Sequence, residues 1–147
     1  MRILRAAGDA GASVPWTEHF SGTAWMDLLL QVTLSPVGGD FTLTSVTFTP
    51  GVRTHWHRHE GGQLLIVLAG HGWVGSRDET CTDIRTGDVV WTAPGEDHWH
   101  GATENTTLTH LAVTLGSTRW DEEVVDPLSL AAELPLSERT PPRGEPG

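Results

Sequence analysis

Short β-type segments separated by turns follow one another along most of this chain, and this pattern limits its fold more than any other feature. Turn-forming pairs such as Pro50-Gly51, Gly61-Gly62 and Pro94-Gly95 divide segments rich in Val, Thr, Leu and aromatic residues. Strands are expected at residues 25–34, 41–49, 52–59, 63–69, 73–74, 89–93, 98–101 and 106–115. Strands at such regular spacing are typical of a β-sandwich or barrel. We therefore predict an all-β fold, a jelly roll of two antiparallel sheets.

The chain of 147 residues is long enough for one domain with a real core. We expect an irregular arm at residues 1–20, the β domain at residues 21–125, and a short helix followed by a Pro-rich tail at residues 126–147. The helix prediction rests on Asp126 as N-cap and on Pro127 in the first helical position. The continuous apolar run at residues 63–69 is typical of a strand that is buried on both faces.

The charge and the cysteine content restrict the partners and the compartment. A net charge of −10 argues against nucleic acid and anionic membrane surfaces. A single cysteine, Cys81, has no partner for an internal disulfide, and no apolar run is long enough to span a bilayer. We therefore expect a cytoplasmic protein. The chain contains no Lys and no Tyr, so neither a lysine Schiff base nor a tyrosine acid can carry its chemistry.

Two histidine-rich segments, residues 57–63 and 95–100, indicate a metal site. Side chains at positions i and i+2 of a strand point the same way, so His57 and His59 can bind one ion, and Gln63 and His98 can complete the shell. Imidazole and amide ligands favour zinc or manganese, with iron, nickel or cobalt as further divalent transition metals. Four neutral donors would leave the full charge on the ion and make it a strong Lewis acid. In the alternative, Gln63 only forms a hydrogen bond inside the sheet, and a water completes the shell.

His110 is the expected acid or base, because an unperturbed histidine titrates near neutral pH. It could instead be a buried neutral histidine that holds a backbone carbonyl, or an additional metal ligand. His55 and His100 lie in register with the proposed ligands and are expected to line the pocket, to replace Gln63 or to support the ligands. Further side chains predicted to line the substrate pocket share inward strand faces: Thr44, Val46, Phe48 and Thr114.

These residues resemble the two motifs of the cupin family. The first motif has the form G-x5-H-x-H-x(3–4)-E-x6-G, and its positions match Gly51, His57, His59, Gln63 and Gly70. The second has the form G-x5-P-x-G-x2-H-x3-N, and its positions match Gly87, Gly95 and His98, whereas Ala93 replaces its Pro and Ala102 its Asn. The resemblance covers residues 40–115 and implies a jelly-roll fold.

The substitution of Gln63 for the usual Glu narrows the resemblance to one subgroup of small cupins, and the length of the chain is similar to that of a second group. With the HWHGA segment at residues 98–102 and the pair Thr109-His110, the chain is similar to manganese-dependent hydroxynitrile lyases. Its length is also similar to that of cupin cyclases that act on aromatic polyketides in antibiotic biosynthesis. Both groups imply Lewis-acid and histidine chemistry on a small hydrophobic carbonyl or phenolic substrate.

Of these activities, the sequence favours an aromatic polyketide cyclase, and a hydroxynitrile lyase ranks second. The motifs are also compatible with a metal-dependent dioxygenase and with a non-enzymatic ligand-binding cupin. A homodimer is expected, because small cupins commonly pair their long edge strands.

Overall fold

The computed structural model describes residues 1, 3, 13–33, 39–78 and 81–125. These residues form ten strands and no helix. The strands are β1 (Val14–Trp16), β2 (Ala24–Thr33), β3 (Asp40–Phe48), β4 (His57–His59), β5 (Gln63–Ser76), β6 (Thr82–Arg85), β7 (Val89–Thr92), β8 (His98–Ala102), β9 (Leu108–Leu115) and β10 (Thr118–Trp120). The described residues therefore contain no helix that could cross a membrane.

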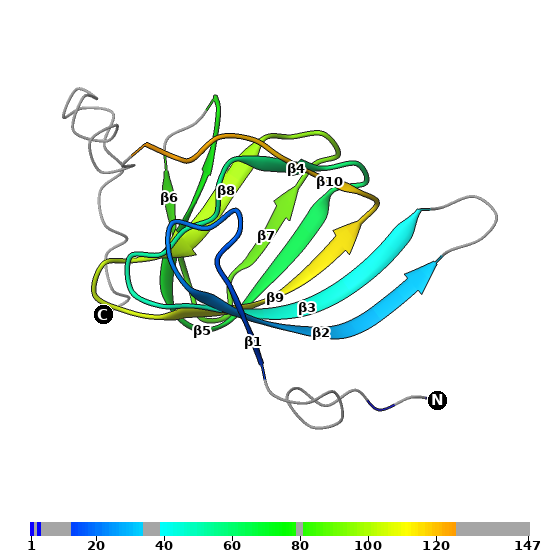
Figure 1. Cartoon of the computed structure of the whole chain (residues 1–147), viewed down its shortest axis with the longest axis horizontal. Coiled ribbons are helices and arrows are strands. Elements are labelled where there is room, and N and C mark those ends of the chain that lie inside the picture. The colour runs from blue at the N-terminus through cyan, green and yellow to red at the C-terminus, as the bar shows by residue number, and fades with distance from the viewer. Residues whose placement is uncertain (2, 4–12, 34–38, 79–80, 126–147) are drawn as a thin grey trace, which may run out of the picture.

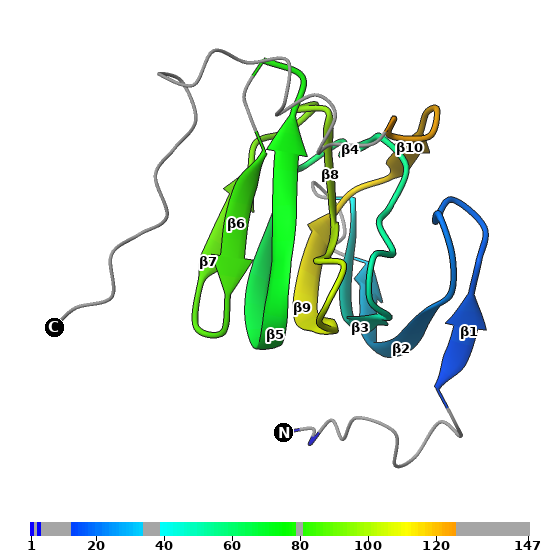
Figure 2. The ribbon, with the colours of Figure 1, turned by 90° about the vertical axis from the view of Figure 1, so that its left-hand side faces the viewer.

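The strands pair in antiparallel fashion in the order β1-β2-β3-β9-β5-β8-β4-β10, and the resulting sheet curls into two walls. Strands β2, β3, β9 and the first half of β5 form one wall, and β8, β4 and β10 lie across from it (Figure 1). Strands β6 and β7 extend the sheet beside β5, at the opposite end from β1 (Figure 2). The predicted all-β jelly roll is confirmed.

Strand β5 belongs to both walls, because its first half pairs with β9 and β7 and its second half with β8 and β6. The two strands expected at residues 63–69 and 73–74 form this one strand, which bends near Gly70. Gly70 has a φ of 87°, and a Cβ atom at this position would collide with the carbonyl oxygen of Thr107. Glycine therefore lets one long strand change walls without a break.

Three other expectations are corrected. Residues 14–16, expected in an irregular arm, form β1 on the edge of β2, and Phe20 packs into the core. The strand expected at residues 52–59 is regular only from His57 onward, because the chain bends at Trp56. The apolar run at residues 63–69 is buried on one face only, since alternate residues on its other face are partly exposed. The predicted helix and tail at residues 126–147 lie outside the described residues.

The apolar core fills one end of the barrel. Its buried members include Phe48, Leu108, Ala102 and Val52, with Phe20 and Ala24 packed against them. The next inward row across the sheet consists of Val46, His110 and Val67, and a further row contains Thr42, Thr114, Gln63 and Thr92. The interior therefore changes from apolar to polar along the strands, and the polar rows contain the predicted site.

Candidate metal centre

Five histidine rings and one glutamine amide meet inside the barrel. They come from four strands: His57 and His59 from β4, Gln63 from β5, His98 and His100 from β8, and His110 from β9. Each of these side chains is buried, with an exposed fraction of 4 % or less. The ring centroids of His57 and His98 are 4.2 Å apart, and that of His59 lies 5.1 Å from His57 and 5.2 Å from His98. The two motifs are thus brought together as predicted.

Hydrogen bonds at Nδ1 orient three of these rings. Nδ1 of His57 lies 2.9 Å from the carbonyl oxygen of His55, and Nδ1 of His98 lies 3.1 Å from that of Glu96. A carbonyl oxygen only accepts hydrogen bonds, so both rings carry a proton on Nδ1 and a free lone pair on Nε2. Nδ1 of His59 lies 2.9 Å from the hydroxyl of Thr118, and its Nε2 is buried without a partner. This arrangement leaves Nε2 as the ligand atom, as is usual when a second group fixes the tautomer of a metal-binding histidine.

The side chains of Gln63 and His98 are in direct contact. Nε2 of Gln63 donates to the hydroxyl of Thr114 at 3.0 Å, which turns the amide oxygen toward Nε2 of His98, 3.1 Å away. With the Nδ1 proton of His98 on the Glu96 carbonyl, two lone pairs face each other across this short distance. A divalent ion coordinated by both atoms would resolve this contact, and so would the reversed amide, which donates to Nε2 of His98 and accepts from the hydroxyl of Thr114.

Burial keeps these imidazoles neutral. Desolvation lowers the pKa of His57 well below its ordinary value, and repulsion from His98 adds to this effect. Desolvation also lowers the pKa of His98, and it lowers those of His59 and His110 to about 4. Neutral imidazole is the form that binds a metal or accepts a proton at neutral pH.

His100 has two roles open to it. One ring nitrogen of each of His57, His98 and His100 lies within 4.8 Å of the others, which makes these three a second candidate ligand set. Nδ1 of His100 also lies 3.1 Å from Nε2 of His110. Nε2 of His100 and Nδ1 of His110 are both buried without a partner. His100 therefore stands between the candidate ligands and His110.

The predicted pocket residues of β3 share its inward face. Phe48 lies against the rings of His100 and His110, with centroid distances of 5.7 and 5.4 Å. Val46 is the cross-strand neighbour of His110, and Thr44 is that of Ala112. Thr114 lies beside Gln63 through the hydrogen bond between their side chains. The structure therefore places these four residues on the same inward side as the histidines, and Val46 and Phe48 are also part of the packed core.

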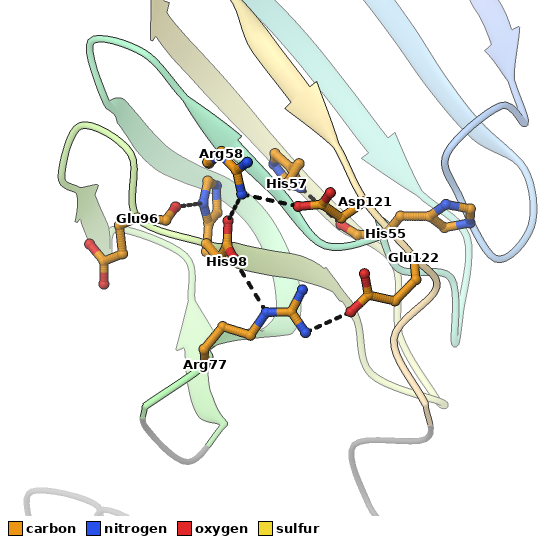
Figure 3. A network of polar contacts seen from close by, with 9 residues as sticks. His55, His57, Arg58, Arg77, Glu96, His98, Asp121 and Glu122 are labelled. Carbon is orange, nitrogen blue, oxygen red and sulfur yellow. Dashed lines mark hydrogen bonds and ion pairs between the residues drawn. The ribbon is translucent and has the colours of Figure 1, made fainter.

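His55 is not brought to this cluster. Its Nε2 lies 3.7 Å from a carboxylate oxygen of Glu123, and its ring lies edge-on to that of His19. Figure 3 shows its ring directed away from His57 and His98. The prediction that His55 lies beside the ligands assumed regular strand alternation across residues 55–59. The bend at Trp56 breaks that alternation.

An ion-pair network behind the site was not predicted. Arg58 contacts Asp97 at 2.9 Å and Asp121 at 3.2 Å, and Arg77 contacts Glu122 at 2.7 Å (Figure 3). Burial alone would raise the pKa of Asp97, but hydrogen bonds from the two arginines outweigh it and leave the pKa below its usual value. The network ties β4 to the segments before β8 and after β10. The sequence offered one signal, because an arginine between two inward histidines must point outward.

Strand β10 supports the ligands from a second side. Besides the contact of Thr118 with His59, the ring of Trp120 lies 4.6 Å from that of His57 and stacks on that of His19. Nothing in the sequence distinguished this three-residue strand from a turn.

Comparison with known proteins identifies the family of this chain. The cupin domain family matches residues 44–114. An (R)-mandelonitrile lyase from Granulicella tundricola is 44% identical over 126 residues, which cover 86% of this chain and 91% of the relative.

Solved structures agree with this assignment. A cupin-like protein from Thermotoga maritima superposes with a TM-score of 0.70 at 32% identity, over 83% of this chain and 92% of its own. A polyketide cyclase from Streptomyces resistomycificus superposes with a TM-score of 0.56 at 18% identity, over 76% of this chain and 80% of its own, which shows a shared fold. From its relatives, its fold and its two histidine motifs, the chain belongs to the cupin family.

Proposed function

We propose that this protein is a metal-dependent cupin lyase that cleaves and forms cyanohydrins of small aromatic aldehydes, of which (R)-mandelonitrile is the prototype. The observation that carries the proposal is the buried cluster in which neutral imidazoles and the amide oxygen of Gln63 face a common point. The mandelonitrile lyase relative, at 44% identity, shifts the balance from the cyclase that the sequence favoured to the lyase.

The residues that would hold the ion are His57 and His98 together with His59 and Gln63, or together with His100. A divalent ion among neutral donors would supply Lewis-acid polarisation of a substrate oxygen. Zinc and manganese remain the favoured ions because of the nitrogen and amide-oxygen donor set.

The pair formed by His100 and His110 can accept the hydroxyl proton of the cyanohydrin and later return a proton to cyanide. Cleavage of a cyanohydrin removes the hydroxyl proton, breaks the bond to the nitrile carbon and releases cyanide with the electron pair of that bond. The unpartnered Nε2 of His100 accepts the hydroxyl proton, and its hydrogen bond to His110 lets the pair share the charge. The pair then returns one proton to cyanide, so aldehyde and hydrogen cyanide leave and both rings are neutral again.

The inward side chains around the cluster suit an uncharged aromatic substrate. Phe48 and Val46 lie beside the catalytic pair, and Thr44 and Thr114 add hydroxyl groups. The inward residues from Thr42 to Phe48 of β3, and those of β9 and the first half of β5, carry no formal charge. An apolar wall with a few polar groups favours a neutral aryl aldehyde over a charged or phosphorylated ligand.

Cyclisation of an aromatic polyketide needs the same Lewis acid and base. It stays a prediction from the resemblance to cupin polyketide cyclases. The cyclase neighbour, at 18% identity, supports the fold and no activity.

The test is the cleavage of racemic mandelonitrile by metal-loaded protein. Benzaldehyde formation is followed by absorbance, and the remaining enantiomers by chiral chromatography. The proposal predicts consumption of one enantiomer, with loss of the activity on chelation and in His98→Ala. Absence of cleavage above the buffer rate by protein of verified metal content would rule the lyase out and leave the cyclase and oxygenase assays to be done.

A further inference from the structure

The candidate ligands His57 and His98 are oriented by the same local arrangement. In each case Nδ1–H donates to the carbonyl oxygen of the residue two positions earlier, at 2.9 Å from His57 to His55 and at 3.1 Å from His98 to Glu96. The position of each carbonyl therefore decides where Nε2 of the ligand points. A carbonyl oxygen moves only with its whole peptide unit, because that unit is planar. The groups that hold these two peptide units thus also orient the ligands.

Both peptide units are tied to the ion-pair network. The first unit joins His55 to Trp56, and its N–H donates to the carbonyl oxygen of Glu122 at 3.0 Å. The second unit joins Glu96 to Asp97, and two arginines donate to the Asp97 carboxylate at 2.9 and 3.4 Å. The orientation of both ligands therefore depends on residues that do not belong to the cluster itself.

Arg77, which directly follows β5, is the residue that both units share. Its Nε donates to Asp97 at 3.4 Å, and its Nη1 contacts Glu122 at 2.7 Å (Figure 3). Its guanidinium also lies over the ring of Trp56, 4.1 Å from the centroid. An isolated exposed ion pair would restrict these residues little. A planar guanidinium that is held on three sides has one position, so Arg77 fixes the two peptide units relative to each other.

We propose that Arg77 is a positioning residue of the metal centre. It acts through the carbonyl groups of His55 and Glu96, and it keeps the Nδ1 protons of His57 and His98 in place so that both Nε2 atoms are free to face one ion. The inference rests on the metal site of the proposed function and not on the cleavage of cyanohydrins. It gives the network behind the site a role in metal binding.

Two substitutions of the arginine and one matched control test the proposal. Arg77→Gln removes the charge and the three contacts, and Arg77→Lys keeps the charge alone. The Arg77 side chain is 38% exposed, so the fold should tolerate both changes. The control is Arg85→Gln, because Arg85 pairs with Asp83 at 3.0 Å outside the cluster.

Two quantities are measured on each protein. Competition with a chromogenic chelator gives the zinc dissociation constant, and nitrogen NMR of the imidazoles shows which ring nitrogens of His57 and His98 carry the proton in the metal-free chain. Loss of a positive charge near a cation would by itself strengthen zinc binding. Weaker binding in Arg77→Gln therefore reports lost positioning and not lost charge.

We expect the zinc dissociation constant to rise about tenfold or more in both Arg77 variants and to stay unchanged in Arg85→Gln. Both imidazoles should carry the proton on Nδ1 in the wild type and in the control, and both Arg77 variants should show a mixture of tautomers. Equal dissociation constants in Arg77→Gln and Arg85→Gln would overturn the proposal. So would unmixed Nδ1–H tautomers in the Arg77 variants, because the arginine would then act only on stability.

The two measurements also separate this proposal from the metal site on which it rests. A wild type that binds no zinc would refute the metal site, and the tautomers of the metal-free chain would still show whether Arg77 orients the imidazoles. Arg77→Lys decides the matter if Arg77→Gln does not fold. Neither measurement uses cyanohydrin cleavage, so a failed lyase assay would leave the result unchanged.

Discussion

The proton positions on the buried histidines decide what the cavity can bind. Backbone carbonyls hold the Nδ1 protons of His57 and His98, and the hydroxyl of Thr118 contacts Nδ1 of His59. Each of these contacts leaves Nε2 for a ligand. Gln63, turned by Thr114, adds an oxygen that faces Nε2 of His98. The result is a buried set of neutral nitrogen and oxygen donors, which suits a divalent cation.

His110 should act on the proton rather than on the metal. His110→Ala is expected to retain its metal and to lose about two to four orders of magnitude in kcat for cyanohydrin cleavage, the usual contribution of a general acid or base, because it breaks the acid–base pair of His100 and His110. His71→Ala is the control, because His71 lies on β5 beside Asp83 and outside the cluster. Elemental analysis and kinetics on both variants check the prediction. Loss of metal in His110→Ala would make this residue a ligand.

The stability of the metal-free protein should depend on pH through the same histidine. Burial lowers the pKa of folded His110 to about 4, whereas an unfolded histidine titrates near about 6.5. Well above that unfolded pKa both states are neutral, and as the pH falls toward 4 only the unfolded state gains a proton. The free energy of unfolding should therefore fall by about 2 kcal/mol for this residue between about pH 7 and about pH 5.

Urea denaturation of chelated protein at several pH values measures this effect. His110→Gln removes one titrating group and should flatten the pH dependence relative to the wild type. Parallel curves for the two proteins would show that His110 titrates normally in the folded state.

At the scale of elements, β10 supports the ligand strand β4. It pairs with β4 along its whole length, and Thr118 contacts His59 while Trp120 packs against His57. Arg58, which points away from the site, joins β4 to Asp121 just beyond β10. The position of the β4 histidines therefore depends on the last described strand of the chain.

Removal of the hydroxyl of Thr118 should weaken metal binding without loss of a ligand. Thr118→Val keeps the branched shape and leaves Nδ1 of His59 without its partner, so metal affinity should fall about 10- to 100-fold. Ser117→Ala is the control, since the Ser117 hydroxyl contacts Glu60 and no histidine. Competition with a chromogenic chelator measures the affinities, and equal values in the two variants would contradict the role assigned to β10.

Sequence patterns predicted most strands and the metal motifs, but not the elements that depend on distant partners. The positions of His57, His59 and His98 follow from local spacing and survive in the structure. His55 was misplaced because the bend at Trp56 interrupts a period that looks regular in the sequence. Strands β1 and β10 have three residues each, and their pairing with β2 and β4 decides their conformation.

At the scale of the whole molecule, the two faces of one wall of the barrel differ in chemistry. Its inward residues include Gln63 and His110, and its outward residues on β3, β9 and the first half of β5 carry no charge. The apolar run at residues 63–69 predicted burial on both faces. In the structure Leu64 and Ile66, on the outward side, are only half-buried.

The claim that one divalent metal is bound by the two histidine motifs is tested most directly by the metal content per chain. Elemental analysis should be made on the wild type and on His98→Ala, with His71→Ala as the control. We predict close to one zinc or manganese per chain in the wild type and the control, and none in His98→Ala. No metal in the wild type after reconstitution, or full metal in His98→Ala, would contradict the account.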